Sequence, residues 1–475
     1  MSTTAVHTSP YSGSWYPGER GELEDLLDRL FTDSESRTGN SLLPGGAGFV
    51  VPHAGLMYSG TVAAAAYRHL LNRPIERVVM IGFSHRGSAP GAWLPDAECY
   101  RTPVGDTLVD RDAVELLGDE KSLRKTPEER VCDHSVEIQL PLLQRVAPQA
   151  KLVPVYIFQL KAQTRHAVAK ALARLADGRT VFIASSDFTH YGHAFNYEPF
   201  PADHRVSDRL WSLDHAVVDG AAGINDEMFL NTIRDTGATV CGFEPISLLL
   251  AIVKELERGE EHYQQKLDYQ TSGEITGDFH HSVSYMALGY FPYSSMLLNE
   301  ADQEALMDSA RQTLDRYRRT GEREPIVTQR SSPALARPCA AFVSLHKRGE
   351  LRGCVGMSEP VEALSRAVPE MALAAALDDS RVPPLGRDEP DIDVEISVLS
   401  PLKPIASRAD FRVNEHGALL EAGFQRGLLL PQVATEFGWT AEDFFKGLAR
   451  KSGARMSVYD DPSTRIYTFR AQVIH

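Results

Sequence analysis

The first half of the chain contains short, continuous apolar runs that stop abruptly at polar segments. Three such runs end at Val51, Ile81 and Ala184, and His53, His85 and His190 follow them. Runs of this kind are typical of buried parallel strands, whose carboxyl ends share one edge of an open α/β sheet. We therefore expect these three histidines to converge at that edge, although they lie far apart in the sequence.

Apolar residues at spacings of three and four between these runs indicate amphipathic helices. The helices are expected at 21–31, 60–71, 164–175 and 246–256, and further strands at 151–158 and 282–290. Alternating strands and helices predict an α/β domain, which we place at residues 1–295.

Residues 296–475 have a different pattern. Asn299 is placed to cap a helix that ends at Gly321, and two apolar segments flank Lys347–Gly349 as a hairpin. Further strands are expected at 391–399, 427–430 and 465–469, and helices at 362–377, 431–437 and 441–451. Hairpins with interspersed helices predict a smaller α+β domain.

Composition narrows the class of protein. The 475 residues are 43% hydrophobic and 24% charged, which is enough for two cores, and the formal net charge is −15. This charge argues against a nucleic acid or an anionic membrane as partner, and no apolar run approaches the roughly 20 residues that span a bilayer. Five cysteines without paired spacing suit a reducing compartment, so a cytoplasmic protein is expected.

Cys241 lies just before the helix at 246–256. A helix N-terminus favours a thiolate over a thiol, and the thiolate is the form that binds metal or attacks an electrophile. A buried structural cysteine is the alternative.

His134 and Glu137 share a face of a short predicted helix, because they are three residues apart. They either orient a metal ligand or substrate, or form a satisfied polar pair beneath the sheet edge. Imidazoles with one anionic ligand hold Fe(II), Zn or Cu, so a metal site is predicted. The alternative is that each histidine only makes a loop hydrogen bond.

Seven segments resemble the Memo family in sequence and in order. They are GSWYPG (13–18), VPHAGLMYSG (51–60), IGFSHRG (81–87), YRTPVGD (100–106), CDHSVEIQLP (132–141), SSDFTHYG (185–192) and TVCGFEPI (239–246). That family is similar to the class III extradiol (LigB-type) dioxygenases, which have an α/β fold with a parallel or mixed sheet flanked by helices. In those enzymes two histidines and a glutamate bind Fe(II), and another histidine is the acid/base.

The resemblance implies roles for single residues. His53 and His85 match the metal histidines, His190 matches the acid/base with Asp187 to position it, and Cys241 stands where the glutamate is expected. A thiolate is softer than a carboxylate and shifts preference toward Cu(I), Zn or a differently tuned iron. Glu244 is the nearby carboxylate that a loop shift would bring in, although Pro245 stiffens that turn.

The second half resembles the AMMECR family. The segments are LHKRGELRGCVG (345–356), ALDDSRVPPL (376–385), DVEISVLSP (393–401) and RGLLLPQVATEFGW (426–439). Members of that family occur beside or fused to Memo-like and radical SAM proteins, which implies a radical SAM partner. Cys354 is its candidate reactive residue, with Arg352 beside it in a cleft. A small buried strand residue and surface ion pairs are the alternatives.

Two functions follow as hypotheses. In the first, the chain is an iron-dependent oxidoreductase of the extradiol type, in which Cu or Zn could replace Fe(II). In the second, the pocket binds metal or peptide without turnover and serves in assembly or metal handling.

Overall fold

The computed structural model describes residues 6–85, 89–118 and 120–475. The chain divides into two compact units, residues 1–292 and 293–475. The boundary expected from the sequence was residue 295. Arg86 and Gly87, which end the IGFSHRG segment, lie outside the described residues.

A nine-stranded mixed sheet runs through the first unit. Its centre is parallel, in the order β2 (Gly48–Val51), β9 (Thr180–Ser185), β3 (Arg77–Phe83) and β8 (Lys151–Phe158). The flanking strands are β12 (His281–Pro292), β10 (His190–Gly192), β11 (His262–Thr271), β4 (Gly91–Pro95) and β7 (Leu123–Thr126). The strands before His53 and His85 are therefore not neighbours, because the strand before His190 lies between them.

A separate three-stranded sheet in the first unit is formed by short strands near its amino end. These strands are β1 (Val6–Thr8), β5 (Cys99–Thr102) and β6 (Gly105–Leu108).

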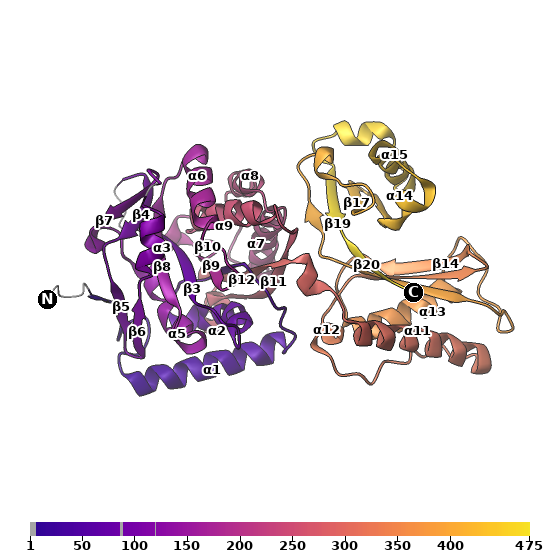
Figure 1. The fold of residues 1–475 in the computed structure, drawn as a ribbon, viewed down its shortest axis with the longest axis horizontal. Helices are drawn as coiled ribbons and strands as arrows, with labels where there is room; N and C mark the ends of the chain where they lie inside the picture. The colour runs from indigo at the N-terminus through magenta and orange to yellow at the C-terminus, as the bar shows by residue number, and fades with distance from the viewer. Residues whose placement is uncertain (1–5, 86–88, 119) are drawn as a thin grey trace. The chain divides into compact units, whose positions relative to one another are not determined.

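Helices cover both faces of the large sheet (Figure 1). On one face lie α6 (Ala162–Ala173) and α9 (Phe243–Leu256), and on the other lie α1 (Arg20–Thr38), α2 (Leu56–Tyr67) and α5 (Leu140–Val146). The remaining helices of this unit are α3 (Arg111–Leu116), α4 (His134–Glu137), α7 (Val206–Ala222), α8 (Asp226–Thr236) and α10 (Ser272–Thr276).

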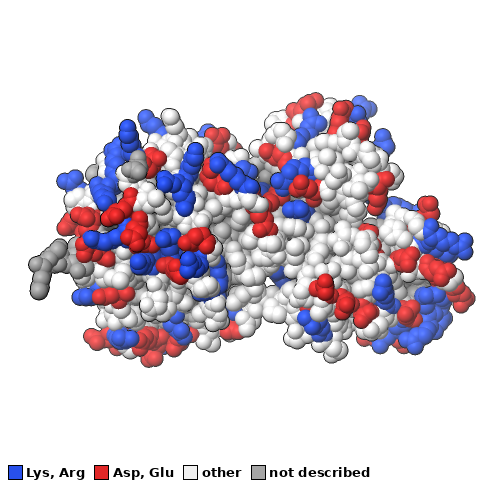
Figure 2. Space-filling model, in the orientation of Figure 1, with Lys and Arg blue, Asp and Glu red and all other residues white. Residues whose placement is uncertain are grey.

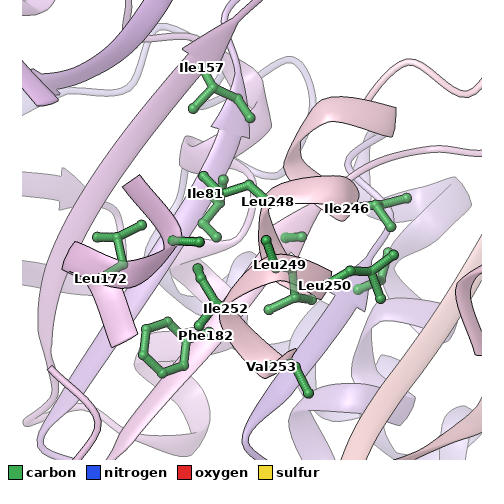
Figure 3. Packing of buried hydrophobic residues seen from close by; sticks show 14 of the residues in the cluster. Ile81, Ile157, Leu172, Phe182, Ile246, Leu248, Leu249, Leu250, Ile252 and Val253 are labelled. Carbon is green, nitrogen blue, oxygen red and sulfur yellow. The ribbon is translucent and has the colours of Figure 1, made fainter. Parts of the chain in front are cut away.

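The main core lies between α9 and the sheet. Figure 3 shows Leu248 and Ile252 of α9 near Ile81 and Phe182 of the central strands. Burial of an aliphatic or aromatic side chain of this size contributes about 1.5–3 kcal/mol. The packing of apolar side chains against the sheet therefore fixes the position of the helix that follows Cys241.

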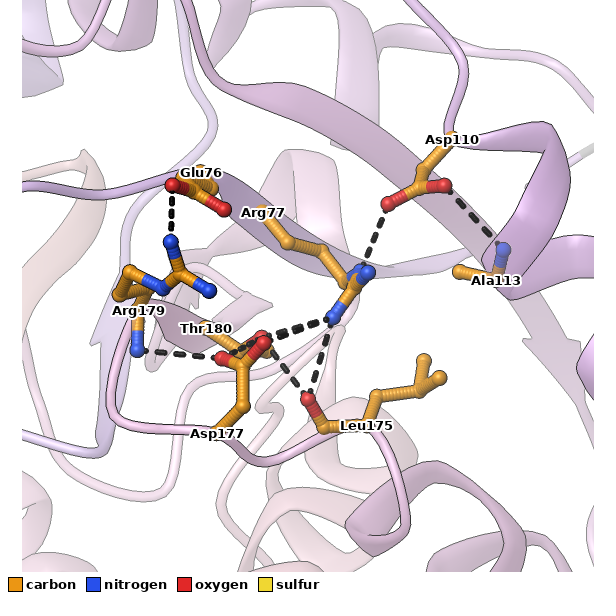
Figure 4. A network of polar contacts seen from close by, with 8 residues as sticks. All are labelled: Glu76, Arg77, Asp110, Ala113, Leu175, Asp177, Arg179 and Thr180. Carbon is orange, nitrogen blue, oxygen red and sulfur yellow. Dashed lines mark hydrogen bonds and ion pairs between the residues drawn. The ribbon is translucent and has the colours of Figure 1, made fainter.

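The amino ends of the central strands carry a polar network (Figure 4). Arg77 at the start of β3 donates to Asp110 Oδ2 (2.7 Å) and Thr180 Oγ1 (3.1 Å). Asp110 in turn caps α3 by accepting from Ala113 N (3.1 Å). This network fixes the sheet at the edge opposite to the three histidines.

The second unit contains two four-stranded sheets. The first is β14 (Glu350–Met357), β13 (Ala341–Lys347), β15 (Asp393–Leu399) and β20 (Ala471–Ile474). The second is β16 (Lys403–Pro404), β19 (Arg465–Phe469), β17 (Gly417–Ala422) and β18 (Gln425–Leu429). The helices are α11 (Glu300–Thr320), α12 (Pro333–Ala336), α13 (Leu364–Leu377), α14 (Gln432–Phe437) and α15 (Ala441–Lys451). This is the predicted smaller α+β domain.

Charged side chains of both signs are interspersed on the face that Figure 2 shows. Among the described residues, no helix combines the length and apolar character that crossing a membrane requires.

Candidate metal centre

Two of the strand-end histidines lie together at the carboxyl edge of the sheet. His53 follows β2 and His85 follows β3, and their ring centroids are 5.5 Å apart. His190 begins β10 and is close enough to act on the charge of His53. The convergence expected from the strand pattern is therefore present for His53 and His85.

The His53 ring is fixed by a hydrogen bond at its Nδ1. Its Nδ1 lies 3.2 Å from Ser185 Oγ, and Gln139 Nε2 donates to the same oxygen (3.1 Å). His53 is 1% exposed, and burial lowers its pKa to about 3. A neutral imidazole with Nδ1 bound in this way leaves Nε2 available as a metal ligand.

His85 is held in a similar way by a carboxylate. Asp133 Oδ2 accepts from the His85 backbone N–H (2.6 Å) and lies 3.2 Å from its Nδ1. The pKa of Asp133 is lowered, although burial opposes the shift, because the carboxylate accepts from His85 and Ser135. A carboxylate behind a histidine raises the basicity of the nitrogen that faces a metal.

His190 is anchored by backbone carbonyls. Its Nδ1 lies 2.9 Å from Phe188 O and 3.0 Å from Thr239 O, so Nδ1 carries the hydrogen and donates it. Its Nε2 is consequently the nitrogen that can accept a proton or bind a metal.

Asp187 does not position His190, contrary to the sequence-based expectation. Its Oδ1 accepts from the backbone N–H groups of His53 (2.7 Å) and Ala54 (3.3 Å). Burial raises the pKa of Asp187, although the charge of His190 and these N–H groups oppose the shift. Asp187 therefore fixes the His53 loop by serving as the acceptor for two of its backbone N–H groups.

Cys241 lies beside His53, with 3.1 Å between Sγ and His53 Nε2. The next residue has no side chain because a Cβ on Gly242 would approach Ser186 Cβ to 2.4 Å. This close approach brings the Cys241 turn against the loop that leads to His190.

The protonation state of Cys241 differs from the prediction. Burial and the neighbouring Asp187 carboxylate raise the pKa of the thiol. The helix-terminus effect is weak here because it is worth about 1 kcal/mol or less, whereas burial of a charge costs more. Cys241 is therefore a thiol unless a cation binds to it.

His134 belongs to the cluster itself. Its ring stacks on His85 at 4.4 Å and lies 5.1 Å from the His53 ring and 4.6 Å from the Trp15 ring, centroid to centroid. Burial and the charges of His53 and His85 lower its pKa to about 3. Among the described residues, no hydrogen bond reaches either of its ring nitrogens.

Glu137 is not part of this cluster, which corrects the first of the two interpretations given above. It is fully buried, and its Oε1 lies 3.0 Å from Nε2 of His7 on β1. The helix α4 is only one turn long, so its two ends contact different neighbours. Glu137 holds the amino-terminal strand, and His134 faces the other histidines.

Glu244 is also not available as a ligand. Its carboxylate accepts from the backbone N–H groups of Gln159 (2.6 Å) and Leu160 (2.8 Å). It thereby ties the start of α9 to the loop after β8, and a loop shift toward a metal would leave two N–H groups without an acceptor.

The possible ligand atoms in the described part of the chain form two groups of three. One contains His53, His85 and His134, and the other contains His53, Asp187 and Cys241; within each group the atoms lie within 4.8 Å of one another. The predicted trio of His53, His85 and Cys241 is thus divided between two groups that share His53. The donor chemistry, imidazole nitrogen with one thiol, suits a borderline or soft transition metal.

In the second unit, Cys354 lies half-buried on β14. Its Sγ accepts from Ser344 Oγ (3.2 Å), and its backbone N–H donates to Asp379 Oδ2 (2.9 Å). All five cysteines are free.

Arg352 forms an ion pair with both oxygens of Glu389 (2.9 and 3.0 Å) and donates to Pro383 O (2.8 Å). Together with the bond from Cys354 to Asp379, these contacts tie the ALDDSRVPPL segment to the hairpin. They give Arg352 a structural role.

Sequence reasoning missed the roles of Ser185 and Gln139. Both lie in segments that were singled out, and for Ser185 the available signal was a polar residue at the end of a fully buried strand. Their function depends on the tertiary contact behind His53, which no local pattern reveals.

The fold and site together define an α/β protein with a candidate metal centre at the carboxyl edge of its sheet. A family model described as Memo-like protein matches residues 8–289, and one described as AMMECR1 matches residues 307–474. The chain belongs to the Memo-like family and carries an AMMECR1 domain as its second part.

The chain is similar to several individual proteins. A MEMO1 family protein of Thermoplasma acidophilum is 31% identical over 58% of this chain and 96% of its own length. A memo-1 homolog of Caenorhabditis elegans is 27% identical over 59% of this chain and 81% of its own. The crystal structure of an uncharacterized protein from Pyrococcus horikoshii is 32% identical, covers 37% of this chain and 92% of that one, and gives a TM-score of 0.36.

Proposed function

We propose that the first unit is a metal-dependent oxidoreductase of the extradiol type that acts on a small molecule. The observation that carries the proposal is the anchoring of His53, His85 and His190 through Nδ1, which leaves three Nε2 atoms at one sheet edge. Ligands for the ion come from His53, His85 and Cys241. Fe(II) is the proposed ion, with Cu or Zn as alternatives. When bound, the metal supplies Lewis acidity and redox chemistry.

His190 is the proposed acid/base. Its Nδ1 hydrogen is held by two backbone carbonyls, so Nε2 is the atom that takes a proton from substrate and returns it. Thr239 also anchors the backbone of His190, because its Oγ1 accepts a hydrogen bond from His190 N (2.9 Å). The ring is therefore fixed in both position and tautomer.

A second candidate function is a metal- or peptide-binding module without turnover, which serves in assembly or metal handling. Cys241 supports it, because a thiol replaces the expected carboxylate and both nearby carboxylates, Asp187 and Glu244, are bound to backbone N–H groups. An oxidisable thiol is also unfavourable beside a metal that activates oxygen.

The AMMECR1 domain is proposed to dock a radical SAM protein. Five free thiols support a reducing compartment, and we propose the cytoplasm.

Oxygen uptake by Fe(II)-loaded protein with a catechol tests the oxidoreductase proposal. We expect uptake in the wild type, none in His53→Ala, and none in His190→Ala, which should retain its iron. The matched control is His204→Ala, an exposed histidine that should behave as wild type. Bound metal without uptake would favour the binding module, and uptake that survives His190→Ala would remove His190 from the mechanism.

A further inference from the structure

His7 of β1 lies between two glutamates. Its Nε2 is 3.0 Å from Oε1 of Glu137 on α4, and its Nδ1 is 3.5 Å from Oε1 of Glu128. A neutral imidazole carries a hydrogen on one nitrogen alone, so it can direct a hydrogen at one of the two carboxylates. The geometry therefore fits the protonated imidazolium, which has a hydrogen for each of them. We call these three residues the clamp.

Burial makes the clamp depend on the charge of His7. The Glu137 side chain is 1% exposed, and the His7 side chain is 13% exposed. Among the described residues, His7 is the cationic side chain that pairs with Glu137. Removal of one partner from a buried ion pair is strongly destabilising, because it leaves the other charge uncompensated. Loss of the His7 proton therefore weakens the clamp.

The other titratable groups around the clamp stay neutral near neutral pH. Tyr100 of β5 lies against His7 with ring centroids 5.1 Å apart, and burial raises the pKa of Tyr100 well above its usual value. Burial also raises the pKa of Cys132 to about 12 and raises the pKa of Tyr16. Burial opposes protonation of His7 itself, but the carboxylates of the clamp outweigh it and raise the pKa of His7 above its usual value of about 6.5.

The clamp anchors a segment that covers one side of the histidine cluster. This segment, residues 6–18, begins with β1 and continues as turns, and we call it the strap. β1 is three residues long and lies at the edge of its sheet, beside β5. The Trp15 ring lies 4.6 Å from the His134 ring, and Trp15 O accepts from Leu56 N (3.0 Å), three residues after His53.

Both contacts of the strap meet the same short helix. His134 begins α4 and lies against Trp15, and Glu137 ends α4 and pairs with His7. We infer that the strap is a pH-dependent cover of the histidine cluster, closed while His7 is protonated and released when His7 loses its proton. The inference rests on the proposed function, because it takes this edge of the sheet as the place where a ligand enters.

Proton binding favours the closed strap. In the closed strap the clamp raises the pKa of His7, whereas in the released strap His7 faces water with its usual pKa of about 6.5. Closure is therefore fully favoured below about pH 6.5, and this advantage is lost as the pH rises through the raised pKa. The site should open on the alkaline side.

Hydrogen exchange of the full chain, read by mass spectrometry on peptides of the strap, tests this inference. It is measured without metal or substrate, so its outcome does not depend on the proposed function. The wild type is compared with His7→Gln, which is neutral throughout, at about pH 6 and about pH 9, on either side of the His7 titration. Comparison at one pH cancels the intrinsic exchange rate, and peptides of α9 are the internal reference.

At about pH 6 we expect the strap to exchange several-fold faster in His7→Gln than in the wild type, and at about pH 9 we expect equal rates. Peptides of α9 should exchange equally in both proteins. Glu128→Gln weakens the clamp, so it should lower the pH at which the strap is released. The matched control is Glu129→Gln, an exposed neighbour that should leave this pH unchanged.

Two results would overturn the inference. If the strap of His7→Gln exchanges like that of the wild type at both pH values, the clamp does not hold it. If exchange is faster by the same factor at both values, His7 supports the strap without acting as a switch. Should His7→Gln fail to fold, an unchanged release pH in Glu128→Gln is decisive against the inference. None of these results affects the proposed function, which fails instead if the wild type binds no metal.

Discussion

Replacement of Glu244 by glutamine separates a structural role from metal binding. This carboxylate is 8% exposed and accepts two backbone N–H groups, from Gln159 at 2.6 Å and Leu160 at 2.8 Å. A glutamine amide has one oxygen, so in Glu244→Gln its NH₂ group faces one of the two donors. Gln159 has φ of 50°, an unfavourable conformation that this contact helps to hold.

The expected loss follows from these contacts. A hydrogen bond to a charged acceptor contributes about 1.5–3 kcal/mol, and a buried donor left without an acceptor adds to the loss. We expect a decrease of about 2–3 kcal/mol in the free energy of unfolding of the first unit. For a unit of this size that corresponds to a decrease in Tm of about 3–5 °C.

Differential scanning calorimetry and metal titration on the same sample measure both effects. The matched control is Glu255→Gln on the same helix, whose partner Arg258 is 70% exposed. A pair of this kind is worth less than about 1 kcal/mol. We expect Glu244→Gln to lower Tm and leave metal affinity unchanged. Loss of metal binding at unchanged Tm would show that Glu244 is a ligand and that our account of this residue is wrong.

Three further predictions concern other residues. Ser185→Ala should weaken metal binding by about 10–100-fold without unfolding the protein, measured by chelator competition, because it removes the partner behind His53; unchanged affinity would contradict this. Burial lowers the pKa of His69 to about 4, so between about pH 6.5 and 4 the unfolded state binds a proton that the folded state does not. The free energy of unfolding should therefore be highest above this window and fall by up to about 3 kcal/mol through it. If His69→Gln shows the same dependence of stability on pH as the wild type, His69 is not its source. Bound Cu(I) should protect Cys241, but not Cys354, from alkylation read by peptide mass spectrometry, and equal protection of both would contradict thiol ligation.

Much of the secondary structure could be predicted because it depends on local pattern. The strands at 151–158 and 465–469 and the helix at 441–451 have the expected bounds. Asn299 and Thr440 cap their helices through their side chains as their residue types suggest.

Several of the strands that were not predicted lack such a pattern. In β11 both apolar and polar residues occur at buried and at half-exposed positions. The strands β4 to β7 are only four or five residues long. The insertion of β9 between β2 and β3 is a tertiary arrangement that neither strand encodes alone.

Only part of the candidate site could likewise be predicted from the sequence. His53, His85 and His190 could be placed at one edge because parallel strands share a direction. The hydrogen-bond and ion-pair partners of Asp187, Glu137 and Glu244 could not be predicted, because these partners come from segments that are distant in the sequence. Helix spacing suggested one face for His134 and Glu137, but a single turn does not constrain its two ends to one environment.

The most direct test of the metal centre is elemental analysis of anaerobically purified protein, with His53→Ala purified in parallel. The account predicts close to one equivalent of a transition metal in the wild type and none in the variant, because His53 belongs to both groups of ligands. Equal metal content in the two proteins, or no metal in the wild type after loading with Fe(II), Cu(I) or Ni(II), would contradict it.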